Sequence, residues 1–270
     1  MSTWNASADN YDNAQVNDSR YRVVANAMLE RVRIMRNERV VDLGCGTGVL
    51  TGLLLARFGR LDIQVFSVDS ASGMIERASA ACRHEQVQFI HGPAEELATL
   101  VPEPVDLVLC NAAFWLMDMR AVFSAVGKTL RPGGVFAASL PAADSGRKAR
   151  DVFQLYARSR LAWLILEERQ LRGHGAPRTR RTAAPSVVRA EELAKELHWK
   201  EAFSAQVETT SPAESVMAYL DVPAMRGWSS LLADLDDVER TDILTTVRNE
   251  LAWTDAHASP KRWQILGWQR

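Results

Sequence analysis

The chain of 270 residues carries 32 Lys and Arg against 33 Asp and Glu, a formal net charge of −1, and 47% of its residues are hydrophobic. These values are those of an ordinary globular chain that can bury a sizeable core, and they give no global sign of a nucleic-acid or membrane partner. The three cysteines, Cys45, Cys82 and Cys110, are scattered through predicted core elements. This arrangement argues against a disulfide framework and against a metal site.

The N-terminal residues are polar. Residues 1–18 are rich in Asn and Asp and predict an irregular arm, and they lack the apolar core of a signal peptide. No apolar run in the chain approaches the roughly 18 residues of a membrane span. We therefore expect a cytoplasmic protein. After the arm, Val24, Met28, Val32 and Met35 recur at the spacing of one helix face, which predicts a helix over 20–35.

Residues 39–48, with the sequence Arg-Val-Val-Asp-Leu-Gly-Cys-Gly-Thr-Gly, contain a glycine-rich turn. The apolar residues before it predict a strand buried on both faces of a parallel sheet, and Leu50, Leu53 and Leu54 after it predict a helix. A strand-to-helix turn directs free backbone N–H groups and the positive end of the helix at a ligand. Glycines at 44, 46 and 48 allow the ligand to lie against bare backbone.

The spacing of these glycines limits the ligand. A dinucleotide fingerprint needs a two-residue gap before its third small residue, whereas the gap here is one residue, and a P-loop needs a Lys that is absent. Asp42 suits a ligand that carries an ammonium group. The D-x-G-x-G-x-G pattern of residues 42–48 resembles motif I of the class I S-adenosylmethionine (SAM)-dependent methyltransferases. The resemblance implies that Asp42, Gly44, Cys45, Gly46 and Gly48 surround the methionine end and ribose of SAM.

A second strand is predicted over 62–68, and it ends at Asp69. An acidic side chain at such a strand end can accept hydrogen bonds from both hydroxyl groups of a ribose, although a plain turn aspartate is the alternative. Asp69 matches the acidic residue of motif II in the same family, with Ser70 beside it. Met74, in the following helix, is placed either to touch adenine or to pack inward.

A third strand over 87–91 leads into Gly92-Pro-Ala-Glu-Glu-Leu97. The family usually has Gly-Asp-Ala-Glu here, with the Asp reaching the adenine amino group. Pro93 replaces that Asp and has no polar side chain, so the resemblance assigns adenine contact to the Ala94 backbone and to Glu95. The departure puts these individual assignments in doubt but not the fold.

The fourth strand, 105–110, is followed by Asn111 and an apolar stretch. The matching family segment lies beside the SAM sulfonium and often carries a His, whereas this chain has Phe114 and Trp115 there. These two rings are either a wall that faces the sulfonium or simple core packing. In the arm, Tyr11 with Asp12 resembles a Tyr-Asp pair of small-molecule methyltransferases whose arm folds over SAM, and a surface tyrosine is the alternative.

A helix is predicted from Met119, and Leu130-Arg-Pro-Gly-Gly134 ends it before a fifth strand over 135–140. These landmarks together resemble the class I SAM-dependent methyltransferases, in particular the ubiquinone/menaquinone-type and malonyl-carrier-protein enzymes. The resemblance implies an α/β fold with a Rossmann-like, seven-stranded, mostly parallel sheet whose last strand is antiparallel, plus helical cap or lid insertions. Strands over 201–209 and 262–268 complete this sheet.

Residues 144–189 contain ten Arg and one Lys against two Asp and two Glu, a local charge of +7. Insertions after the fifth strand lie over the substrate crevice in this fold, so we expect a basic lid. Its charge is either a solvated face or a docking surface for an anionic small molecule or a carrier protein, and nucleic acid is not favoured. The expected division is an N-terminal arm and helix (1–36), a SAM-binding core (37–143), the lid (144–189) and a C-terminal part (190–270) with a helical insertion at 212–258.

The sequence thus predicts an enzyme that transfers a methyl group from SAM to a small-molecule acceptor and leaves S-adenosylhomocysteine (SAH). None of the five histidines forms a recognisable pair with a carboxylate, so no catalytic residue is assigned. The alternatives are a SAM-binding protein without methyl transfer, such as a cyclase or a regulator, and an aminopropyl- or NAD-type enzyme. The acceptor and the choice between monomer and homodimer stay open.

Overall fold

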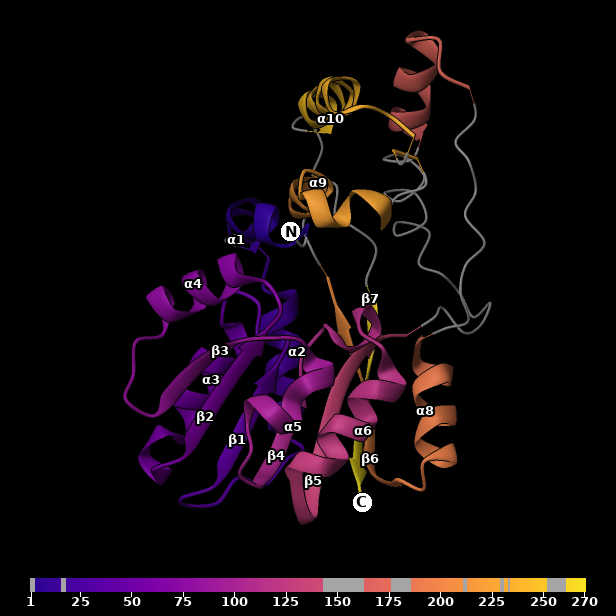
Figure 1. Ribbon diagram of the computed structural model, residues 1–270. Coiled ribbons are helices and arrows are strands. Elements are labelled where there is room, and N and C mark those ends of the chain that lie inside the picture. The colour runs from indigo at the N-terminus through magenta and orange to yellow at the C-terminus, as the bar shows by residue number, and fades with distance from the viewer. Residues whose placement is uncertain are drawn as a thin grey trace.

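The structure is a computed structural model that describes residues 3–15, 18–142, 163–175, 186–210, 213–228, 231–232, 234–251 and 261–270. A seven-stranded sheet of order β3-β2-β1-β4-β5-β7-β6 forms its centre (Figure 1). The strands are β1 (Arg39–Leu43), β2 (Gln64–Asp69), β3 (Val87–His91), β4 (Val105–Cys110), β5 (Leu130–Pro141), β6 (Lys200–Thr209) and β7 (Lys261–Gln269). Strands β1 to β5 pair in parallel, and β7 is antiparallel to both β5 and β6. The predicted fold class, with its reversed last strand, is confirmed.

Helices cover both faces of this sheet. On one face, α2 (Arg20–Leu29) and α3 (Val49–Phe58) pack on the strands, and on the other α5 (Leu97–Leu100), α6 (Met119–Thr129) and α8 (Ser186–Glu196) do so. Helix α4 (Ser72–Ala81) lies against β2 and β3. Val40 and Val41 are both fully buried and belong to the cores on opposite faces, as expected for a central parallel strand. The short 3-10 helices are η1 (Asn5–Ser7), η2 (Gly59–Leu61), η3 (Ala94–Glu96), η4 (Phe114–Leu116) and η5 (Pro223–Trp228).

The N-terminal arm is more regular than expected. It forms η1 and then α1 (Ala8–Gln15), so the prediction of an irregular segment is wrong for these residues. Ala8 and Ala14 are buried, because the arm packs on α4 and on α9 (Ala213–Leu220). A helix of this length is marginal in isolation, and such packing is what stabilises it.

Two other boundaries differ from the prediction. Helix α2 ends at Leu29 rather than Met35, and Ile34 is buried from a non-helical link instead. Strand β5 begins at Leu130, because this residue already pairs with Val105 before a shift in register. The Pro-Gly-Gly sequence therefore lies inside an irregular strand start, where Gly133 adopts a φ of 81°.

A helical cap lies above the carboxyl ends of the parallel strands (Figure 1). We use this name for the helical residues 163–171 with α9 and α10 (Asp237–Leu251). The cap has an apolar core of its own, separate from the two cores of the sheet, to which Leu164, Met217 and Ile243 contribute. Among the helices that the structure describes, none has the length and apolar character needed to cross a bilayer.

Candidate functional site

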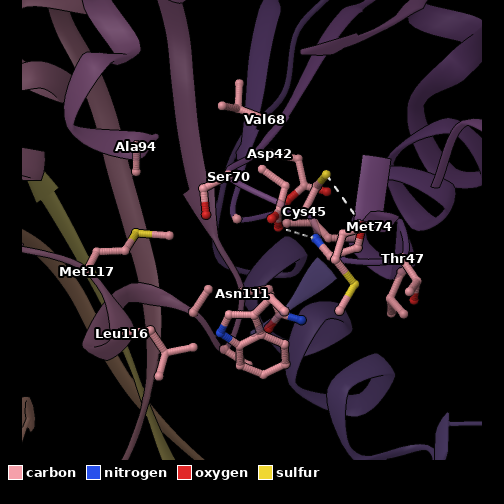
Figure 2. Close-up of a pocket in the computed structure, with 18 of the residues that line it drawn as sticks. Asp42, Cys45, Thr47, Val68, Ser70, Met74, Ala94, Asn111, Leu116 and Met117 are labelled. Carbon is pink, nitrogen blue, oxygen red and sulfur yellow. Dashed lines mark hydrogen bonds between the residues drawn. The ribbon is translucent and has the colours of Figure 1, made fainter. Parts of the chain in front are cut away.

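A cavity opens where β1, β2, β3 and β4 end (Figure 2). Trp4, Tyr11 and Gln15 of the N-terminal arm also line it. It brings together eleven of the twelve residues predicted to contact the cofactor. They are Tyr11, Asp42, Gly44, Cys45, Gly46, Asp69, Ser70, Met74, Pro93, Ala94 and Asn111. Gly48 is not among the lining residues, because it caps α3 at a φ of 91° and a Cβ there would lie 3.3 Å from the Ala78 Cβ. The lack of a side chain at Gly48 therefore allows the start of α3 to pack on α4.

The turn after β1 presents bare backbone to this cavity. Gly44 and Gly46 have φ values of 70° and 54°, a region that favours glycine. A Cβ added to Gly46 would meet no atom within 4 Å, whereas one on Gly44 would lie 2.8 Å from both Ala113 Cβ and Met117 Cε. The first glycine thus allows close packing of the chain after β4, and the second keeps the cavity open.

Asp42 lies under the turn with a fully buried side chain. Its Oδ2 accepts a hydrogen bond of 2.7 Å from Thr51 Oγ1, which also lies 2.7 Å from the buried Ser67 Oγ. Its Oδ1 has no hydrogen-bond partner in the part of the chain that the structure describes. Burial raises the pKa of Asp42 to about 7, and the bonds from Thr51 only partly offset this effect. A buried acceptor without a donor favours a cationic ligand.

Asp69, at the end of β2, fastens the turn to the neighbouring strand. Its Oδ2 accepts the Gly46 N–H and its Oδ1 accepts the Ala71 N–H, both at 2.9 Å. Burial raises the pKa of Asp69, and these N–H groups act in the opposite direction. Each carboxylate oxygen has a further lone pair, so the group can still accept hydrogen bonds from a ligand.

The corner after β3 combines apolar and polar groups. Pro93, Ala94 and Glu95 all line the cavity there. Met74 packs inward on Ala71 and also lines the cavity, so its predicted contact with adenine stays a prediction. His91 places its Nε2 3.1 Å from the Ser70 carbonyl oxygen and does not line the cavity.

The chain after β4 corrects one interpretation. Phe114 is fully buried and packs edge to face on Phe123 and Phe136, with ring centroids 5.4 and 5.2 Å apart. Neither Phe114 nor Trp115 lines the cavity, so core packing is the right alternative for Phe114 and the wall facing a ligand is wrong. Leu116 and Met117 face the cavity instead (Figure 2).

Sequence reasoning also missed the aromatic side of the cavity. Trp4, Gln15 and Tyr21 contribute to it from η1, α1 and α2. The rings of Tyr11 and Tyr21 lie 6.2 Å apart, and burial raises the pKa of both phenols, that of Tyr11 well above its ordinary value. Only the Tyr11-Asp12 pair gave a signal in the sequence, because the other three residues carry no motif.

The charges at the cavity are one-sided. Among the described residues that line it, Asp42, Asp69 and Glu95 are acidic and none is Lys, Arg or His. This lining suits a ligand with positive charge, and it contains no imidazole or amine that can act as a base.

Comparison with known proteins agrees with this geometry. Residues 40–134 match a family model described as a methyltransferase domain. This part of the chain is similar to the methyltransferase-domain family. The match covers the turn after β1, Asp69 and the chain after β4, the segments that carried the resemblance in the sequence.

Curated relatives and solved structures support the same domain. The chain is 37% identical over 119 residues to trans-aconitate 2-methyltransferase of Rhizobium rhizogenes, which covers 43% of this chain and 44% of the relative. It is 36% identical over 96 residues to malonyl-[acyl-carrier protein] O-methyltransferase of Priestia megaterium, covering 35% and 34%. Each match thus spans less than half of the relative's own length. A SAM-dependent methyltransferase from Geobacter sulfurreducens, solved with SAH, has a TM-score of 0.51 at 17% identity over 91% of this chain and 90% of its own, which supports the fold.

Proposed function

We propose that this protein is a SAM-dependent methyltransferase that acts on a small-molecule acceptor. The observation that carries the proposal is the buried Oδ1 of Asp42, without a partner among the described residues, in a cavity that the open backbone of Gly46 also lines. SAM carries an ammonium group that can donate to this oxygen, and such a bond would remove the cost of burying an acceptor without a partner.

The other predicted contacts fit the rest of the donor. Asp69 keeps lone pairs for two ribose hydroxyl groups, although both of its oxygens already accept backbone N–H groups. Pro93, Ala94 and Glu95 form the corner assigned to adenine. When bound, SAM supplies an activated methyl group, and the chain then has to orient the acceptor and exclude water. The arm, Leu116 and Met117 enclose the cavity for this purpose.

The lining of the cavity also limits the acceptor. It offers no basic side chain among the described residues, and the raised pKa values of Tyr11 and Tyr21 keep both phenols protonated at neutral pH. This described lining favours an acceptor whose nucleophile needs no base, and a carboxylate meets this condition. Trans-aconitate and the malonyl group, the acceptors in the names of two relatives, both carry carboxylates.

The division into arm, SAM-binding core, basic lid and C-terminal part belongs to this proposal. Of the basic residues at 144–189, Arg169 is bonded to Asp234, and Arg172 pairs with Glu168 and Asp242. These two arginines stabilise the cap, so they do not support a docking surface for an acceptor. Of the predicted lid, residues 163–175 and 186–189 are described, and residues 144–162 and 176–185 lie outside the described residues.

Calorimetry tests the donor site. We expect the protein to bind SAM and SAH but not NADH, and Asp69→Ala to weaken SAH binding by ~1–3 kcal/mol, the scale of hydrogen bonds to a charged group. Ser204→Ala is a suitable control, because its hydroxyl accepts from Gln264 on the far strands β6 and β7. Binding of NADH alone, or an unchanged affinity in Asp69→Ala, would contradict the proposed donor site.

A transfer assay separates an enzyme from a mere SAM binder. SAH release is measured with trans-aconitate, a malonyl thioester, a phenol and a primary amine as acceptors. We expect turnover with the carboxylates and not with the amine, which needs a base to remove its proton. Tight SAH binding without turnover of any acceptor would instead favour a binding protein or regulator.

A further inference from the structure

One wall of the cavity is held by the side chain of Ser139, which does not itself line the cavity. The wall is residues 111–117, which we name the post-β4 segment, and Asn111, Ala112, Leu116 and Met117 of this segment line the cavity. At its centre, Phe114 is anchored in the aromatic core. Its N-terminal part is anchored differently, by a polar network inside the sheet.

Ser139, a fully buried residue of β5, is the centre of that network. Its Oγ accepts the backbone N–H of Ala112 at 2.8 Å and donates to Asn111 Oδ1 at 3.0 Å. Asn111 Nδ2 then donates to the carbonyl oxygen of Tyr21 at 3.1 Å. One hydroxyl group thus satisfies two polar groups of the segment and connects β5 to α2.

The backbone needs this support at Ala112. Its φ of 57° lies in the left-handed region, which costs a non-glycine residue roughly 1–2 kcal/mol. Such a conformation persists only where neighbouring groups hold it. The hydrogen bond from the Ala112 N–H to Ser139 is the contact that does so directly.

The position of the segment has little tolerance. Ala113 and Met117 pack so closely over the glycine turn that a methyl group on Gly44 would lie 2.8 Å from each. A shift of the segment would therefore change the distance between the donor turn and the opposite wall. Methyl transfer depends on such distances, because donor and nucleophile must meet in a near-attack arrangement.

We propose that Ser139 is a positioning residue for methyl transfer, which holds Ala112 in its left-handed conformation and so fixes the post-β4 segment over the donor turn. This inference rests on the proposed function. It assigns Ser139 an effect on the rate of the bound complex more than on donor affinity, since the turn, Asp42 and Asp69 are held by other bonds and Asn111 keeps its bond to Tyr21.

The first test is Ser139→Ala, assayed with the acceptor of highest turnover in the panel above. We expect kcat to fall about 10-fold, because the Ala112 N–H and Asn111 Oδ1 lose their buried partner, and the SAH dissociation constant to change less than about 3-fold. Ser204→Ala removes an exposed strand hydroxyl at the far edge of the sheet and should keep the wild-type kcat. An unchanged kcat in Ser139→Ala, or an equal loss in donor affinity, would overturn the proposal.

A rescue variant separates positioning from general stability. Glycine adopts a φ of 57° without strain. The kcat of the double variant Ser139→Ala/Ala112→Gly should therefore be at least about 3-fold higher than that of Ser139→Ala alone. A merely structural role of Ser139 predicts no recovery, because a second cavity-side change would add to the damage.

Amide exchange decides the structural part without any turnover. Residues 111–117 should exchange faster in Ser139→Ala than in the wild type, while β1 and β2 keep their protection. Equal exchange in both proteins would refute the positioning role. If the wild type turned over no acceptor, the proposed function would fail by itself, and this exchange measurement would still decide whether Ser139 holds the segment.

Discussion

At the scale of single residues, Asp42 is a carboxyl group whose ionisation is opposed by its burial. Its pKa of about 7, raised by burial, means that the proton competes with a cationic ligand near neutral pH. We expect SAH affinity to be constant above pH 7 and to fall by up to about 10-fold per pH unit below it, because Asp42 must then lose a proton before it accepts from the ammonium group. Calorimetry from pH 5.5 to 8.5 measures this profile.

Asp42→Asn is the control for this profile. The amide keeps the size of the side chain but does not titrate, so we expect weak SAH binding that varies less with pH than in the wild type. Asp69, whose pKa is also raised, is present in both proteins and cancels in the comparison. Parallel profiles for the two proteins would show that Asp42 does not meet the ammonium group.

Two glycines of the turn form a matched pair, since both lie at positive φ but face different surroundings. Gly46→Ala places its methyl group in the open cavity, so we expect it to bind SAH at least about 10-fold more weakly. Its free energy of unfolding should fall only by the cost of the left-handed backbone, ~1–2 kcal/mol. In Gly44→Ala the new methyl group collides with Ala113 and Met117, so this variant should lose a further ~1–3 kcal/mol of folding stability from overpacking. Chemical denaturation without ligand, together with calorimetry, measures both effects. Equal stability of the two variants would contradict this reading of the turn.

At the scale of elements, the strands and the donor turn could be predicted because their signal is local. Continuous apolar runs that end in Gly, Asp or Asn mark β1, β2 and β4, and the same strand ends bring Asp42, Asp69 and Asn111 to one cavity. A parallel sheet puts such ends at one edge, so local patterns were enough to predict which side chains meet.

Elements that depend on distant partners could not be predicted in this way. Helix α1 is polar in sequence, and its buried alanines are covered by α4 and by α9, far away in the chain. The turn η4 directs Phe114 into the core and leaves Leu116 and Met117 at the cavity, a choice that depends on the aromatic partners Phe123 and Phe136. Ser139 gave no signal in the sequence either, because its role depends on a hydrogen bond from Ala112, which follows the neighbouring strand β4.

At the scale of the whole molecule, the described residues contain the apolar cores of the sheet, that of the cap, and smaller clusters, in one of which Tyr219 of α9 packs with Tyr21 and Trp263. Arg169 is the polar centre of the cap. Its guanidinium, only 2% exposed, donates to both carboxylate oxygens of Asp234 and to the carbonyl oxygens of Leu231 and Gly175, at 2.8–3.0 Å. These bonds connect two parts of the cap that are more than fifty residues apart in the sequence.

Arg169→Met should therefore loosen the cap and leave the sheet intact. The methionine fills much of the same space, but the carbonyl groups of Leu231 and Gly175 and the partly exposed carboxylate of Asp234 lose the donor that connects them to this helix. We expect faster amide exchange in α10 with unchanged protection in β1 and β4. Arg172→Met is the matched control, because its ion pairs are partly exposed and contribute little. If β4 lost protection together with α10, the cap and the sheet would unfold as one unit, and the cap could not open for an acceptor while the donor site stays formed.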